Sequence, residues 1–188
     1  MFSDPVLNNL HKKYGPHEFE DRSELLYEEL VESIIGQQLS GKAADTIFKR
    51  FLALFNNKFP TPEKLMKTSD EKLRSAGMSY SKASYVKNIA KAFADGTLDI
   101  KILKKMSDVE VKKELTKIKG VGNWTAEMTL IFTLKREDVF SIGDAGLRRA
   151  IKKLYNIEKE KDILKLSETW KPKRSYACWY LWRSLENR

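Results

Sequence analysis

The stretch from Leu115 to Ile151 decides the fold, and it reads LTKIKGVGNWTAEMTLIFTLKREDVFSIGDAGLRRAI. It predicts a helix that ends in a glycine hairpin, Lys119–Gly122, followed at once by a second helix that begins at Asn123. Two glycines around one small apolar residue let the backbone turn sharply and approach another surface closely. An extended link then leads to Asp144, which heads a third, basic helix.

The hairpin is a candidate phosphate-binding site. A helix that starts directly after it presents unpaired N–H groups and the positive end of its dipole, so it can hold an anion without any side chain. The basic residues around Gly120 and Gly122 favour this interpretation. The alternative is that the glycines serve only to turn the chain, as they do in many helical hairpins.

Nearly every other segment also predicts a helix. Capping residues mark the starts, because Ser, Thr and Asp side chains accept the free N–H groups of a first turn and proline fits at its first position. These starts are Asp4-Pro5, a capping box of Asp21 with Glu24, Ser40, Thr61-Pro62, Ser69 and the capping box of Ser107 with Glu110. No run alternates with period two for long enough to predict a strand, so we expect an all-α fold.

Composition agrees with one compact domain of 188 residues, of which 41% are hydrophobic and 32% charged. We expect neither a membrane span nor a signal peptide. The single cysteine, Cys178, excludes an internal disulfide and a cysteine-rich cluster. His11 and His17 have no partners at metal-ligand spacing, and we interpret them as ordinary surface residues.

The net charge of +9 is unevenly distributed along the sequence. Residues 1–100 hold 14 Lys/Arg and 14 Asp/Glu, whereas residues 101–188 hold 21 and 12. This asymmetry predicts a polyanion that docks mainly on the second half. A lysine-rich surface that serves only solubility is the alternative.

Four blocks, in order, resemble the helix–hairpin–helix DNA glycosylase superfamily and, within it, the alkylated-base branch of the 3-methyladenine DNA glycosylase II type. The blocks are LVESIIGQQLS (30–40), the Gly-Val-Gly hairpin with Trp124, DVFSIGDAGLRRA (138–150) and WKPKRSYACWYLW (170–182). The resemblance covers roughly residues 20 to 188. It implies a two-lobed helical bundle with a helix–hairpin–helix motif, in which the N-terminal helix packs with the C-terminal lobe. We therefore expect a single domain, 1–188, with one lobe at about 25–112 and a second made of about 1–24 and 113–188.

The resemblance assigns the catalytic role to Asp144. A carboxylate beside the sugar can stabilise the positive charge that builds up when an N-glycosidic bond breaks, or can orient water. From the residues alone, an aspartate before AGLRRAIKKLY is expected to N-cap that helix. The two roles are compatible.

The resemblance places Trp124, Trp182 and Met128 in a base pocket, where Met128 replaces a tyrosine common in this branch. A packing role in the core is the alternative for Trp124. Relatives that also cleave the DNA strand carry a lysine nucleophile at the position of Trp124. Tryptophan cannot form a Schiff base, so the resemblance implies a monofunctional enzyme. We interpret Trp170, Tyr176 and Trp179 as packing residues.

The resemblance implies that a side chain of the Gln37–Leu39 loop fills the gap left by a flipped nucleotide, with Gln38 as our choice and Leu39 as the second candidate. Two solvated glutamines at a helix end are the alternative. The implied DNA contacts are Gln37, Gln38, Leu39, Lys119, Gly120, Val121, Gly122, Thr125 and Arg148. A monovalent cation held by the main-chain carbonyls of Thr116, Ile118 and Val121 is also implied.

The expected function is removal of alkylated purines from damaged double-stranded DNA by a monomeric enzyme that needs no redox cofactor or catalytic metal. We expect it in the cytoplasm or nucleoid of a prokaryote, or in the nucleus of a eukaryote. Two alternatives stay open. One is a glycosylase for a deaminated, oxidised or mispaired base, and the other is a non-catalytic helix–hairpin–helix DNA-binding module.

Overall fold

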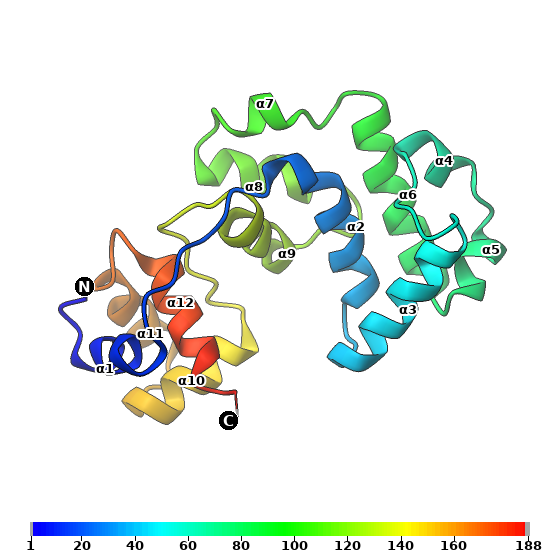
Figure 1. Ribbon diagram of the computed structural model, residues 1–188. Coiled ribbons are helices and arrows are strands. Elements are labelled where there is room, and N and C mark those ends of the chain that lie inside the picture. The colour runs from blue at the N-terminus through cyan, green and yellow to red at the C-terminus, as the bar shows by residue number, and fades with distance from the viewer. Residues whose placement is uncertain (1, 187–188) are drawn as a thin grey trace. The chain divides into compact units, whose positions relative to one another are not determined.

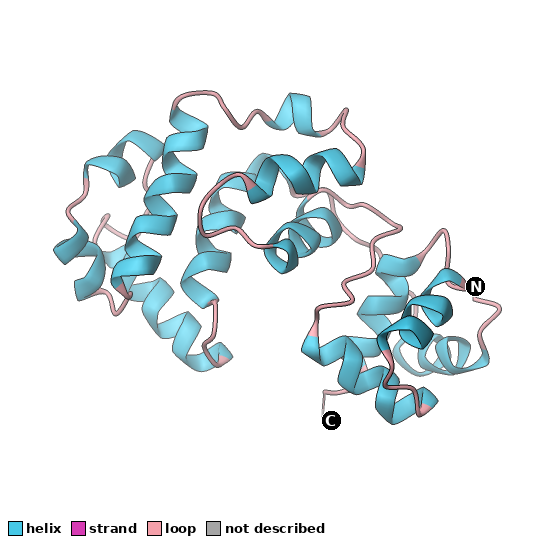
Figure 2. Cartoon of the chain, turned by 180° about the vertical axis from the view of Figure 1, so that it is seen from behind, coloured by secondary structure: helices cyan, strands magenta, loops and turns pink. Residues whose placement is uncertain are grey.

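The computed structural model describes residues 2–186, and every regular element in that range is helical (Figure 1). No strand occurs in the described part of the chain (Figure 2), which confirms the all-α prediction. None of the helices within residues 2–186 combines the length and the apolar character that crossing a membrane requires.

The chain divides into two compact units, Arg22–Thr129 and Met1–Asp21 together with Leu130–Arg188. This division differs from the expected one, because residues 113–129, which carry the hairpin, belong with the first unit. Two side-chain hydrogen bonds join the hairpin to this unit. The amide of Gln37 reaches the carbonyl of Gly120, and the amide of Asn88 reaches the carbonyl of Lys119, so the hairpin is attached to that unit's other helices.

The unit Arg22–Thr129 is built from short helices whose starts follow the predicted capping residues. Thr61, Ser69 and Ser107 each accept the N–H group three residues on, and Ser107 with Glu110 forms the predicted capping box. Ser40 occupies the N-cap position of its helix without a side-chain capping bond. The predicted box of Asp21 with Glu24 does not cap a helix, because η1 and α2 begin after Arg22 and Leu25 without side-chain caps. The helices are η1 (Ser23–Leu25), α2 (Leu26–Gly36), α3 (Gly41–Ala53), α4 (Pro62–Lys67), α5 (Asp70–Ser75), α6 (Tyr80–Ala94), α7 (Ile100–Leu103), α8 (Asp108–Thr116) and α9 (Asn123–Met128).

The second unit brings the two ends of the chain together. Its helices are α1 (Pro5–Tyr14), α10 (Ala145–Tyr155), α11 (Glu160–Glu168) and α12 (Arg174–Arg183), and α1 packs beside α12 as the resemblance implies (Figure 1). Leu7, Ile151 and Leu181 are fully buried in this core. Burying one such side chain contributes about 1.5–3 kcal/mol, so α1 is an integral part of the unit. The π-helical turn η2 (Thr129–Thr133) carries the chain from one unit to the other.

The two histidines are not ordinary surface residues, contrary to the sequence interpretation. His11 Nδ1 forms a hydrogen bond of 2.7 Å with the hydroxyl of Tyr180. The ring of His17 stacks on Trp179 with ring centroids 3.9 Å apart, and burial, together with the charge of Arg183, lowers the pKa of His17. Both therefore help to fix α12. Trp170 is buried as predicted, and its indole N–H donates to the carboxylate of Asp4 at 3.1 Å.

Candidate active site and DNA-binding hairpin

Asp144 is a buried carboxylate whose orientation is fixed by two donors. It is the N-cap residue of α10, so its Oδ1 accepts the main-chain N–H of Leu147 at 2.7 Å. The same oxygen accepts the indole Nε1–H of Trp182 at 2.9 Å. The predicted capping role is therefore confirmed, and the structure joins the candidate catalytic acid directly to a candidate pocket residue.

Gly146 makes room for this pair. A Cβ atom at this position would lie 3.0 Å from Oδ1 of Asp144 and 3.2 Å from Cδ1 of Trp182. Both distances are tighter than ordinary van der Waals contact. A side chain at residue 146 would therefore require the indole or the carboxylate to shift by a few tenths of an ångström.

An ion pair and several hydrogen bonds hold α12 to the link that precedes Asp144. The guanidinium of Arg174 binds the carboxylate of Asp138, with Nε 2.8 Å from Oδ1. Burial disfavours the charged form of Asp138, but the hydrogen bonds and charge of Arg174 outweigh burial and lower its pKa. Ser175 Oγ accepts the N–H of Val139 at 3.0 Å and donates to the carbonyl of Arg136 at 2.6 Å. These contacts fix the two chain segments that carry Asp144 and Trp182.

Phe132 extends the aromatic surface beside Trp182, and sequence reasoning missed it. The two ring centroids are 5.6 Å apart, and Phe132 is 37% exposed although it lies within an apolar run. In the sequence it is one of several apolar residues in Leu130–Leu134, and no local signal separates it from the core positions there.

The hairpin between α8 and α9 uses its two glycines for different reasons. Gly120 has a φ of 111°, and a Cβ there would lie 2.3 Å from Cγ of Tyr85, so the fold itself requires glycine. Gly122 has a φ of −90°, is the N-cap residue of α9, and a Cβ there would meet nothing within 4 Å. Glycine at 122 therefore leaves the start of α9 open to close approach from outside the protein.

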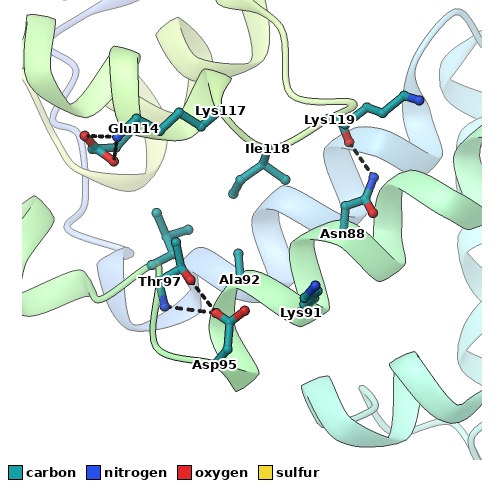
Figure 3. Close-up of a pocket in the computed structure, with 10 residues that line it drawn as sticks. Asn88, Lys91, Ala92, Asp95, Thr97, Glu114, Lys117, Ile118 and Lys119 are labelled. Carbon is teal, nitrogen blue, oxygen red and sulfur yellow. Dashed lines mark hydrogen bonds and ion pairs between the residues drawn. The ribbon is translucent and has the colours of Figure 1, made fainter.

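A cavity of about 320 Å³, lined by both lysines and acids, lies between α6 and the end of α8, on one side of the hairpin (Figure 3). Lys91, Lys117 and Lys119 contribute to its lining, and Lys117 pairs with Glu114. The amide of Asn88 donates to the carbonyl of Lys119 at 3.0 Å, which ties this wall of the cavity to α6 (Figure 3).

The carbonyls of Thr116, Ile118 and Val121 stay a predicted cation site. Main-chain oxygens are suitable ligands for a hard cation, and Ile118 retains a second lone pair although its carbonyl accepts the N–H of Val121 at 2.9 Å. The donor set is therefore compatible with a monovalent cation, which would rigidify the hairpin.

Most of the predicted DNA contacts of the unit Arg22–Thr129 surround one cavity of about 610 Å³. Trp124, which is 43% exposed on the first turn of α9, also lines it, whereas Met128, one turn further on, is half-buried and is not part of this lining. The predicted residues in the lining are Gln37, Gln38, Leu39, Gly120, Gly122, Trp124 and Thr125. In the other unit, Arg148 is an exposed residue of α10 whose Nη1 lies 3.6 Å from Glu160.

This chain is similar in sequence and in fold to known proteins. Residues 31–173 match the family described as HhH-GPD superfamily base excision DNA repair protein. DNA-3-methyladenine glycosylase 1 of Schizosaccharomyces pombe is 39% identical over 91% of this chain and 77% of its own length. DNA-3-methyladenine glycosylase of Bacillus subtilis is 34% identical over 85% of this chain, which spans 57% of that relative. The S. pombe 3-methyladenine DNA glycosylase solved in complex with abasic DNA superimposes with a TM-score of 0.86 at 36% identity, covering 97% of this chain and 92% of that one.

Proposed function

The chain belongs to the HhH-GPD superfamily of base excision DNA repair proteins, and on that premise we propose that it is a monofunctional DNA glycosylase that removes alkylated purines. The substrates are 3-methyladenine-like bases in double-stranded DNA, and the products are the free base and an abasic site. The observation that carries the proposal is the buried Asp144 carboxylate, held by the N–H of Leu147 and the indole of Trp182.

In the proposed reaction, the bond between C1′ and the base nitrogen breaks and its electron pair leaves with the base. Positive charge develops on the sugar, and the fixed carboxylate of Asp144 stabilises that charge. Water then adds to C1′ and loses a proton. Because the Trp182 and Leu147 donors stand in place before the reaction, the carboxylate does not have to reorient as the charge develops.

We propose that Trp182, together with Phe132, whose ring packs beside it, contacts the flipped base. Trp124 and Met128 of the unit Arg22–Thr129 are also proposed base contacts. A purine alkylated at N3 or N7 carries positive charge, which the faces of indole rings attract by roughly 0.5–2 kcal/mol. The charge also weakens the glycosidic bond. A pocket without a general acid is therefore sufficient for such substrates.

The proposed DNA contacts combine main-chain and side-chain groups. The start of α9 after Gly122 receives a phosphate through its N–H groups, assisted by Lys119 and Thr125, and Arg148 contacts the backbone from the other unit. Gln38 fills the gap left by the flipped nucleotide, and Leu39 is the second candidate. We propose that the enzyme acts as a monomer in the nucleoid or nucleus and requires no cofactor, with a monovalent cation at the hairpin as a structural element.

The proposal is tested by incubating the protein with a panel of duplexes that each carry one lesion and measuring the free base released. We expect release from 3-methyladenine or 7-methylguanine duplexes. Release only from an oxidised, deaminated or mispaired base would show that the protein is a glycosylase for another class of lesion. Tight duplex binding with no release from any lesion would favour the non-catalytic module.

The monofunctional assignment is tested on any lesion that the protein processes. Abasic product should stay unbroken until alkali or heat is added, and borohydride should trap no covalent protein–DNA adduct, because Trp124 offers no amine. A trapped adduct would show that another amine acts as a nucleophile.

A further inference from the structure

Lys82 is a partly buried lysine whose ammonium group binds main-chain carbonyls at the end of α2. Its Nζ donates to the carbonyl of Ile35 at 2.8 Å and to that of Gln37 at 2.7 Å. Burial lowers the pKa of Lys82, as expected for an ammonium that has exchanged water for carbonyl ligands. Its main-chain N–H donates to Oγ of Ser79, the N-cap residue of α6, so the helix cap fixes the main chain that carries the lysine side chain.

The Gln37–Leu39 loop needs such support because its backbone is strained. Gln38 has a φ of 58°, in the left-handed region that side chains other than glycine rarely adopt. Such a conformation persists only where surrounding contacts fix it. Lys82 supplies two of these contacts on one side of the loop.

The hairpin supplies further contacts to the loop. The amide Nε2 of Gln37 lies 3.3 Å from the carbonyl of Gly120 and 3.3 Å from Oγ1 of Thr125. The side chain of Gln37 is thus engaged within the protein, whereas Gln38 and Leu39 are exposed. Gln38 and Leu39 line the cavity that Trp124 also lines.

We propose that Lys82 is a positioning residue for nucleotide flipping. By binding the carbonyls of Ile35 and Gln37, it holds the Gln37–Leu39 loop in the conformation that inserts Gln38 or Leu39 into the base stack. The proposal deepens the function proposed above and rests on it, but it concerns the insertion step and not the chemistry. It predicts that removing the ammonium group impairs insertion of the loop side chain into the base stack while duplex binding changes little.

The test uses a readout that does not require base excision. The full-length protein is mixed with a duplex that carries a stable tetrahydrofuran abasic analogue beside 2-aminopurine, whose fluorescence rises when its stacking is disrupted. Lys82→Met keeps the length of the side chain and removes its donors. We expect the fluorescence change to be at least tenfold slower or smaller, while the affinity for an undamaged duplex changes less than threefold.

Lys87→Met is the matched control, because it removes a lysine from the same helix whose partner is Asp70 rather than the loop. It should respond like the wild type. Lys82→Arg, which keeps cationic donors, should restore part of the response. If Lys82→Met does not fold, Lys82→Gln, with a shorter amide donor, is measured in the same assay and should give an intermediate response.

The outcomes separate this proposal from the proposed function. A wild-type fluorescence response in Lys82→Met would overturn the positioning role, as would an equal loss of affinity for damaged and undamaged duplexes. If the wild type releases no base from any lesion but shows an insertion signal that depends on Lys82, the glycosylase assignment fails and the positioning role stands.

Discussion

Asp144 caps a helix and carries the proposed chemistry with one carboxylate, and a single substitution separates the two roles. Asparagine is as good an N-cap as aspartate, so Asp144→Asn keeps an acceptor for the N–H of Leu147 and removes the charge. We expect base release to fall several hundredfold or more while the melting temperature and duplex affinity change little. Single-turnover release and fluorescence anisotropy measure the two quantities. Parallel loss of fold, binding and release would instead indicate a purely capping role.

Trp182 offers its N–H to Asp144 and its ring face to the proposed base pocket, and two variants distinguish these contributions. Trp182→Phe keeps an aromatic face and loses the donor. A hydrogen bond to a charged group contributes about 1.5–3 kcal/mol, so we expect release of every lesion to slow by at least about tenfold. Trp182→Leu removes the aromatic face as well, and excision of a cationic base should then fall further than excision of neutral hypoxanthine.

The measurement is the ratio of single-turnover rates on the cationic and neutral lesions. Trp182→Phe should leave that ratio nearly unchanged, and Trp182→Leu should lower it. Equal ratios in all three proteins would mean that the ring face does not select the base, and that selectivity comes from the leaving group or from other pocket residues.

At the scale of elements, we expect alanine substitutions of the two hairpin glycines to have opposite effects: one lowers stability and the other lowers duplex affinity. Gly120→Ala places a Cβ 2.3 Å from Tyr85 at a positive φ, which should cost at least about 2 kcal/mol and lower the melting temperature by about 5 °C or more. Gly122→Ala meets no atom within 4 Å and should change the melting temperature by about 2 °C at most. Its methyl group should nevertheless lower duplex affinity by about tenfold, because it obstructs a charge-assisted main-chain contact.

The two glycines act as controls for each other when melting curves and duplex affinities are measured on the same preparations. A Gly122→Ala protein with wild-type affinity would show that the start of α9 does not contact phosphate. The hairpin would then serve only to connect α8 to α9.

Local signals in the sequence predict the helix starts well, because a capping side chain acts on a main-chain N–H only three residues away. Ser69, Thr61 and the box of Ser107 with Glu110 were therefore predictable. The π-helical turn η2 was not, because its residues Thr129–Thr133 carry no cap and no distinctive composition.

The candidate site was predictable in its parts but not in its connections. Family motifs identify Asp144, Trp182 and the Gln37–Leu39 loop by sequence position. The hydrogen bond between Trp182 and Asp144 joins residues 38 apart, and the one from Lys82 to Gln37 joins residues 45 apart. Such contacts depend on how the helices pack, which no local pattern encodes.

At the scale of the whole molecule, counting charges by structural unit instead of by sequence half changes the prediction of where a polyanion binds. By sequence halves, all of the +9 lies in residues 101–188. By structural units, Arg22–Thr129 holds 19 Lys/Arg and 14 Asp/Glu, and the other unit, made from both ends of the chain, holds 16 and 12. Both units are therefore net positive. A polyanion has reason to bind each of them, and not only the second half of the sequence.

This distribution predicts that both units contribute to the salt dependence of DNA binding. Each lysine or arginine that neutralises a phosphate contributes about 0.9 to the slope of log affinity against log salt. Lys119→Ala, in the first unit, and Arg148→Ala, in the second, should each lower the magnitude of that slope by about 0.9, and the double variant by about 1.8. Fluorescence anisotropy titrations of one duplex at several salt concentrations measure the slopes.

Two controls make the measurement specific. Gly122→Ala should weaken binding at every salt concentration without changing the slope, because a main-chain N–H group displaces no counterion. Lys161→Ala removes an exposed charge of α11 outside the proposed contacts and should leave the slope unchanged. If Lys119→Ala alters the slope but Arg148→Ala does not, the second unit does not bind phosphate through α10, and the role of that unit is confined to the chemistry around Asp144.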